Sequence, residues 1–345
     1  MIPVLEAVPN FSEGRDPAVV DALVGAVRRH DVEVLDVSMD PDHHRSVLTF
    51  VGHPTAVEQS LVAAAAVAVE RIDLRRHSGV HPRIGAMDVC PVIPLQGLEM
   101  SDAVASAHRI GEGIAALGVP VFWYGDASEG PERALSSLRR GGFEAYVDGW
   151  PEGRTPDLDG GRTGAHPTAG LTCVGARRLL LAWNVWVEGV EGQVLNELAR
   201  TLRERDGGIP GLRVLALELP RQGGHQISMN LEGVEGREPF DVFLQIERHV
   251  EAAGGRISKT EVIGMIPDAL VFPAATHRLR LSEPDPARLL SSSVQRHALG
   301  RMERDLRTVI EWVLGAGSEV PADIRDAARS LAGRATTKPS PTENA

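Results

Sequence analysis

The sequence is poor in cysteine and lysine, and it has no long apolar run. Its 345 residues include 2 cysteines, so neither a disulfide framework nor a four-thiolate zinc site can form, which favours a reducing compartment. The only side-chain amines belong to Lys259 and Lys338, which excludes the Gly-Lys-Ser/Thr motif of a P-loop. No apolar run reaches the roughly 18 residues of a membrane helix, and the start lacks the features of a signal peptide. We therefore expect a cytoplasmic protein without a membrane partner.

The net charge limits the possible ligands, and the chain length predicts the number of lobes. The net charge is -11 at pH 7, from 36 Lys and Arg against 47 Asp and Glu, which argues against nucleic acid as a partner. Arginine supplies nearly all of the positive charge, so an anionic ligand would need arginines clustered locally. A chain of this length suits two lobes of about 150 residues, each large enough to bury its own core.

The order of apolar runs and turn residues predicts the same succession of elements twice. In the first half the pattern predicts a strand at 4–8, a helix at 16–29, strands at 32–38 and 45–52, a helix at 54–72 and a strand at 86–94, extended by a helix at 100–117, a strand at 120–125 and a helix at 131–140. In the second half it predicts a strand at 178–187, a helix at 190–204, strands at 213–219 and 225–231, a helix at 240–253 and a strand at 256–264, followed by helices near 288–299 and 301–314. Both halves have the order βαββαβ. This order predicts an α+β fold of two tandem ferredoxin-like subdomains whose facing sheets enclose a cleft.

His81 is the first candidate for chemistry. It precedes Pro82, which holds its backbone extended, and it ends a glycine-containing loop just before the apolar strand at 86–94. That position lies at the rim of the predicted cleft, and histidine transfers protons near neutral pH. The pattern alone still favours a hydrogen-bonded structural histidine, so a catalytic role stays open on these grounds. His166 lies in a similar His-Pro step within a glycine-rich loop and has the same two interpretations.

Several charged residues gather near these loops. Arg45, Arg83 and Arg162 border the predicted cleft, where bidentate contacts would recognise a carboxylate or a phosphate; ordinary solvated arginines are the alternative. Asp88 lies in an apolar strand, where a charge requires a partner, so it could orient a base or satisfy an arginine. The run "DPDHH" at 40–44 invites a metal interpretation. Its spacing matches no strong ligand signature and a turn uses the same residues, so we predict no metal.

Five blocks of the sequence together resemble the glutamate formimidoyltransferase family. They are "VPNFSEG" at 8–14, "LDVSMDPDHHRSVLTFVG" at 35–52, "HPRIGAMDVCPVIP" at 81–94, "AHPTAGLTCVGAR" at 165–177 and "AWNVWV" at 182–187. The later "ISMNL" and "SKTEVIGMIPDAL" resemble the family's second subdomain, so the resemblance covers about residues 2–275 in order. It implies an N-terminal formiminotransferase subdomain over 1–177 and a C-terminal one over 178–330. We expect the remaining residues 331–345 to form a disordered tail.

The resemblance implies a folate-dependent transferase of one-carbon groups. The family moves the formimino group from N-formimidoyl-L-glutamate to N5 of tetrahydrofolate in histidine degradation, with folate between the two sheets and usually in a homodimer. Tetrahydrofolate is then a co-substrate, the partners are small molecules, and His81 is the general acid and base because it falls on the family's catalytic histidine. From their charge and position, Arg45, Arg83 or Arg162 are expected to bind the glutamate carboxylates of the donor and of folate. The family's folate-binding loop falls on Gly161, Arg162, Thr163, Gly164, Ala165, His166, Pro167, Thr168, Ala169 and Gly170.

Two departures from the family pattern leave alternatives open. His44 stands where the family commonly has asparagine, and Ser38 where some relatives have an acidic residue, so we expect the support around the base to be arranged differently. The sequence does not decide whether His44 or His166 contacts ligand. Too little chain remains for a cyclodeaminase domain, which favours the monofunctional form. The alternatives are another folate one-carbon enzyme, for formyl transfer or 5-formyltetrahydrofolate cyclo-ligation, and a non-catalytic folate-binding homologue.

Overall fold

The fold is known from a computed structural model, which describes residues 3–130, 133–219, 224–232, 239–266, 268–280, 290–316 and 320–336. The chain divides into two compact units. One covers Pro3–Ala274, and the other begins at Ala275. The first unit contains two β-sheets, each with its own hydrophobic core, and the second is helical.

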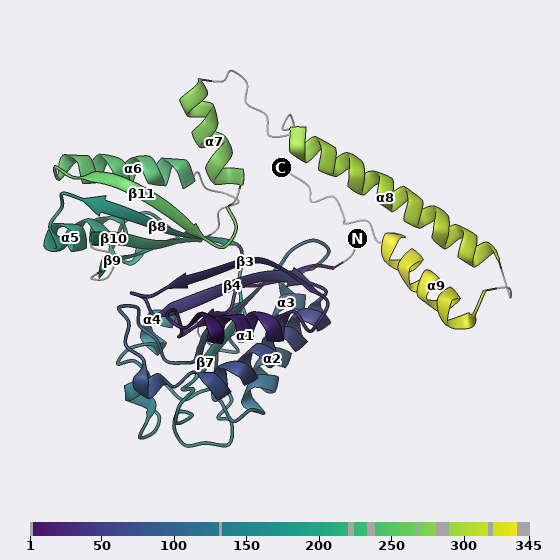
Figure 1. Cartoon of the computed structure of the whole chain (residues 1–345), viewed down its shortest axis with the longest axis horizontal. Coiled ribbons are helices and arrows are strands. Elements are labelled where there is room, and N and C mark those ends of the chain that lie inside the picture. Colours follow the sequence, from purple (N-terminus) through teal and green to yellow (C-terminus); the bar gives the residue numbers. More distant parts are fainter. Residues whose placement is uncertain are drawn as a thin grey trace. The chain divides into compact units, whose positions relative to one another are not determined.

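The first sheet is mixed and is covered on one face by helices. Its path runs β1-β4-β2-β5-β7-β6, with β3 paired to β4, and β7 is parallel to both β5 and β6. In Figure 1, two of the covering helices lie beneath β3 and β4. The strands are β1 (Leu5–Ala7), β2 (Asn10–Phe11), β3 (Val32–Asp40), β4 (Arg45–Gly52), β5 (Met87–Pro94), β6 (Val121–Gly125) and β7 (Thr172–Ala176), and the helices are α1 (Pro17–Val27), α2 (Pro54–Arg71) and α3 (Met100–Ala115).

Local sequence explains where these elements begin and what they bury. Helix α1 begins at a proline, and the side chain of Asp16 caps it by accepting a hydrogen bond from the backbone N–H of Ala18. Strand β5 is buried along almost its whole length, as its apolar sequence predicts for a strand covered on both faces. Leu23, Leu61 and Ile110, one from each helix, are fully buried in the same core as the strands.

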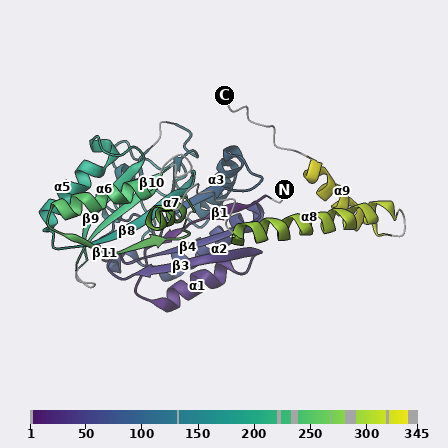
Figure 2. The ribbon, with the colours of Figure 1, turned by 90° about the horizontal axis from the view of Figure 1, so that it is seen from above.

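The second sheet is antiparallel, with the strand order β11-β8-β10-β9. Its core lies between the strands and two helices, and Figure 2 shows α6 running along these strands. Outside that core, Gln226 on β10 pairs in register with Trp186 on β8, and both are buried. The elements are β8 (Leu180–Glu188), α5 (Gly192–Leu202), β9 (Leu212–Leu219), β10 (Gly224–Glu232), α6 (Pro239–Ala252) and β11 (Arg256–Ile263).

The predicted α+β class with two sheets is confirmed, and the differences are local. Strand β7 was not predicted, because its five residues are short and follow a long glycine-rich loop. The helix predicted at 131–140 is only α4 (Leu135–Leu138), since Gly141 and Gly142 then take positive φ and redirect the chain, while residues 131–132 lie outside the described residues. The described residues of the first unit also form three short 3-10 turns, which are η1 (Leu74–Arg76), η2 (Phe143–Tyr146) and η3 (Glu204–Asp206).

The helical part of the chain follows β11. Helix α7 (Asp268–Leu279) leads into it, and α8 (Leu290–Gly315) is one helix where two were predicted, because a lone glycine at 300 costs a helix only about 1 kcal/mol. Helix α9 (Ala322–Thr336) packs its Ala328 against Ile310 and Val313 of α8. It runs through the first residues of the expected tail, and residues 337–345 lie outside the described residues. No helix in the described ranges is long and apolar enough to cross a membrane.

Candidate active site

The loop of residues 77–83, between η1 and β5, lines a surface pocket of about 390 Å³. The opposite wall comes from the segment that follows α4. The pocket is lined by His77, Ser78, Gly79, Val80, His81, Pro82 and Arg83 from the loop, and by Arg139, Gly141 and Gly142 from that segment.

The ring of His81 is held in a form that can accept a proton. Its Nδ1 lies 2.8 Å from the carbonyl oxygen of Pro82, and because a carbonyl only accepts, Nδ1 carries the hydrogen and Nε2 keeps its lone pair. Burial of the ring, followed by the positive charges of Arg45 and Arg139, lowers the pKa of His81 well below its usual 6.5. The residue nevertheless keeps part of its surface exposed. At physiological pH His81 is therefore a neutral imidazole at the wall of the pocket.

A fully buried carboxylate organises the two arginines behind this pocket. Asp88 on β5 accepts hydrogen bonds from Nη1 of Arg45 at 2.8 Å and from Nη2 of Arg139 at 2.5 Å. Burial alone would raise the pKa of Asp88, but Arg139, Arg45 and a backbone N–H from Ile84 outweigh it and hold that pKa well below its usual range. Asp88 thus stays ionised and joins β4, β5 and the pocket wall. The sequence predicts that a charged residue in this apolar strand needs a partner, and the structure confirms this for Asp88.

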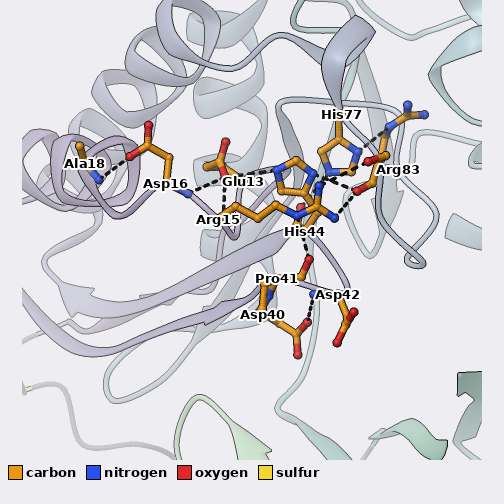
Figure 3. Close-up of polar contacts among 11 residues, drawn as sticks. Glu13, Arg15, Asp16, Ala18, Asp40, Pro41, Asp42, His44, His77 and Arg83 are labelled. Carbon is orange, nitrogen blue, oxygen red and sulfur yellow. Dashed lines mark hydrogen bonds and ion pairs between the residues drawn. The ribbon is translucent and has the colours of Figure 1, made fainter. Parts of the chain in front are cut away.

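The turn between β3 and β4 presents His44 to the pocket loop (Figure 3). Nε2 of His44 lies 3.3 Å from a carboxylate oxygen of Glu13, and Nδ1 lies 3.1 Å from the carbonyl oxygen of Ser78. Burial raises the pKa of Glu13, but the hydrogen bond with His44 and those from the backbone N–H groups of Arg15 and Asp16 outweigh it and lower the pKa to about 2.

His77 lies against His44 and is fixed by two hydrogen bonds. Its Nε2 donates to the carbonyl oxygen of His44 at 2.8 Å, so its Nδ1 is free to accept from Nε of Arg83 at 3.3 Å. Burial, with the charges of the surrounding cations, lowers the pKa of His77 to about 4. Arg83 in turn donates through both Nη atoms to Glu144, each at 2.8 Å. His77 is therefore a neutral spacer between two charged groups.

His43 connects the pocket region to the second sheet. Its Nε2 lies 3.1 Å from Oε1 of Gln226 on β10, and its ring stacks beside that of His81 with centroids 5.8 Å apart. Burial is the main reason why the pKa of His43 is lowered. The histidines of the "DPDHH" run are thus engaged with protein groups. Across the described ranges, no group of three or more His, Cys, Asp or Glu side chains is arranged to hold a metal ion.

The loop at 161–170 contributes no residue to this pocket, although it packs close behind it. The Nδ1 atom of His166 accepts from the backbone N–H of Ala169 at 3.0 Å, so this histidine closes its own turn. Gly170 has a φ of 68°, and a Cβ there would lie 2.0 Å from the carbonyl oxygen of Ile84. Arg162 donates through Nε to the carbonyl oxygen of Gly118 at 2.6 Å.

The structure therefore brings some of the predicted site residues together and not others. His81 and Arg83 line one pocket, and Arg45 lies behind it through Asp88; both arginines already hold a protein carboxylate. Sequence reasoning missed Arg139, which lies more than fifty positions from Asp88 in the chain and outside every matched block. It also missed that Glu13 is the partner of His44. Neither pairing leaves a signal in local sequence.

The comparisons with known proteins agree with the resemblance carried by the sequence blocks around this pocket. The model of the formiminotransferase domain, N-terminal subdomain, matches residues 4–177. Glutamate formimidoyltransferase of Streptococcus pyogenes serotype M1 is 33% identical over 304 residues, which cover 87% of this chain and 100% of that protein. Glutamate formimidoyltransferase of Thermoplasma acidophilum is 33% identical over 86% of this chain and 98% of its own length. Formimidoyltransferase-cyclodeaminase of Rattus norvegicus is 34% identical, over 80% of this chain and 52% of its own. The chain belongs to the glutamate formimidoyltransferase family.

Proposed function

We propose that the protein is a glutamate formimidoyltransferase, which moves the formimino group of N-formimidoyl-L-glutamate to N5 of tetrahydrofolate in histidine degradation. The observation that carries this proposal is the match to the S. pyogenes enzyme, since this chain spans 100% of that protein. Tetrahydrofolate is then a co-substrate, and the partners are small molecules. A cytoplasmic location and a homodimer complete the proposal, on the strength of the family.

The proposed subdomains, residues 1–177 and 178–330, contain one sheet each, and the second also includes residues that belong to the unit beginning at Ala275. The family model ends at residue 177, and the second sheet begins at β8 (Leu180–Glu188). We propose that both are ferredoxin-like. The order β11-β8-β10-β9 is that of a βαββαβ unit whose last strand lies beside its first, and in the first sheet β5 likewise lies beside β1 and β2.

His81 is proposed as the group that moves the proton. N5 of tetrahydrofolate attacks the formimidoyl carbon, its proton passes to Nε2 of His81, and the bond from that carbon to the glutamate nitrogen breaks as the proton is returned to that nitrogen. The neutral ring, with its hydrogen on Nδ1, supports the first step. The charges of Arg45 and Arg139 favour rapid return of the proton, because they destabilise the imidazolium.

The substrate contacts are proposed from the pocket and the adjoining loop. Arg83 faces the pocket with a side chain that is 12% exposed, and its carboxylate partner Glu144 is 63% exposed, so a substrate carboxylate can replace Glu144 on Arg83. Arg45 lies behind the pocket, so its proposed effect on the substrate is indirect and passes through its ion pair with Asp88. The loop at 161–170 is proposed to bind folate with its exposed members, while His166, Ala169 and Gly170 shape it.

One assay tests the function and a variant tests the base. Purified protein is mixed with N-formimidoyl-L-glutamate and tetrahydrofolate, and formation of 5-formimidoyl-tetrahydrofolate is followed spectroscopically. Faster turnover with N-formyl-glutamate, or a requirement for ATP, would favour another folate enzyme, and folate binding without turnover would favour a non-catalytic homologue. His81→Ala should keep tetrahydrofolate binding and lose about 10² to 10⁴-fold in turnover. His53→Ala, at an exposed histidine without a side-chain capping bond, is the matched control.

A further inference from the structure

His44 holds an unusual backbone conformation at the turn between β3 and β4. Its φ is 51°, in the left-handed region that few non-glycine residues adopt, although histidine does so more often than most. The side chain is held there by two polar contacts. Both of its ring nitrogens face oxygens that cannot donate, namely the carboxylate of Glu13 and the carbonyl of Ser78. Only a ring with hydrogens on both nitrogens, the imidazolium, satisfies both partners.

The neighbouring histidine, His77, is neutral and stacks on the ring of His44. The rings of His44 and His77 lie 4.2 Å apart and 6° from parallel. Since His77 donates to the carbonyl oxygen of His44 and accepts from Arg83, it needs no second proton. A proton on both nitrogens of His44 therefore creates no repulsion with His77.

The same contacts fix the beginning of the pocket loop to the turn. The carbonyl oxygen of Ser78 accepts from His44 and also from Nη2 of Arg15 at 2.6 Å. Gly79 packs directly on the turn, because a Cβ there would lie 2.3 Å from the carbonyl oxygen of His43. The backbone N–H of Val80 then donates to the carbonyl oxygen of Asp42 at 3.0 Å. The next residue in the chain is His81.

We propose that His44 is a positioning residue for His81. As a cation bridging Glu13 and Ser78, it holds the loop at 77–83 on the β3–β4 turn and so sets where the ring of His81 meets the substrates. This inference rests on the proposed function. It assigns His44 a task that does not require contact with ligand.

The test removes the ring without straining the backbone. His44→Gly suits the left-handed conformation and leaves a cavity beside His77. We expect kcat to fall by about 10- to 100-fold, as small misplacements of a catalytic group do, with KM for tetrahydrofolate unchanged within about twofold. Added imidazole should restore part of kcat, because it can enter the cavity as a cation. Pyrazole, similar in shape but too weakly basic to be cationic at neutral pH, should not.

Glu13→Gln provides an independent variant should the glycine variant not fold. It keeps the shape of the partner and removes its charge, so kcat should again fall while KM holds. Thermal unfolding establishes that each variant is folded. A folded His44→Gly or Glu13→Gln protein with wild-type kcat would overturn the inference, as would equal rescue by pyrazole or an effect confined to KM. A wild-type protein without formimidoyl transfer would instead overturn the proposed function.

Discussion

Arg83 and Glu144 form a bidentate ion pair, with both nitrogen-to-oxygen distances at 2.8 Å, although the two side chains differ in exposure. Arg83 is largely buried at 12% exposure and is anchored through Nε to His77, whereas Glu144 is exposed at 63%. The arginine is therefore fixed and its partner is exchangeable. In the role proposed for Arg83, such a pair would keep its guanidinium oriented for a substrate carboxylate.

This difference predicts opposite effects for the two partners of the pair. Arg83→Gln should raise KM for N-formimidoyl-glutamate by about tenfold or more, since a hydrogen bond to a charged group contributes about 1.5 to 3 kcal/mol. Glu144→Gln should leave that KM unchanged or lower it, because the competing carboxylate is gone. Steady-state kinetics with each substrate varied separately measures both. If Glu144→Gln raises KM as much as Arg83→Gln does, the pair acts only as a structural tie.

The buried carboxylate of Asp88 predicts a large loss of stability on neutralisation. Asp88→Asn leaves two largely buried arginines without this counter-charge, and breaking a buried ion pair in this way costs about 3 to 5 kcal/mol. Urea unfolding followed by circular dichroism measures the loss. Asp73→Asn is the matched control, because in the Asp73–Arg75 pair the arginine is exposed and the aspartate partly so, and it should change little. Equal midpoints for the two variants would contradict the prediction.

Much of this fold could be predicted because its signals are local. The apolar run at β5 and the prolines that begin α1 and α2 follow from neighbouring residues, and every strand predicted for the two sheets exists. The single helix α8 and strand β7 could not be predicted with the same tools, since one glycine and one short strand are weak signals.

For the site too, some features could be predicted from neighbouring residues, whereas others depend on residues that are far apart in the sequence. His81 is marked by its own His-Pro-Arg context. Its low pKa comes first from burial and then from Arg45 and Arg139, which reach it only through the pairing of β4 with the rest of the sheet and the packing of the segment after α4. Burial, hydrogen-bond partners and pKa are properties of the folded chain, so they required the structure.

Two glycines of the loop at 161–170 predict different outcomes from the same substitution. Gly161 and Gly170 both have positive φ, at 74° and 68°, so alanine incurs a similar backbone penalty at each. A Cβ at Gly161 meets open space, whereas one at Gly170 meets the carbonyl oxygen of Ile84 at 2.0 Å. Gly161→Ala should therefore fold with about 1 kcal/mol less stability, and Gly170→Ala should be far less stable or fail to fold. Thermal unfolding of the two variants side by side measures the difference, and equal melting temperatures would contradict it.

The carboxylate of Glu13 predicts how stability depends on pH. Its pKa of about 2 in the folded protein lies below its usual 4.5, so its contribution is fully present above pH 4.5 and is lost as the pH falls from 4.5 towards 2. The wild type should exceed Glu13→Gln in free energy of unfolding by at most about 3 kcal/mol near neutral pH, and the gap should shrink across that window. Glu33→Gln, at an exposed glutamate on β3, is the control for loss of one carboxylate. Urea unfolding at several pH values from 2 to 7 gives the measurement. A gap between wild type and Glu13→Gln that stays constant across this range would mean that His44 and the backbone N–H groups do not stabilise the Glu13 carboxylate.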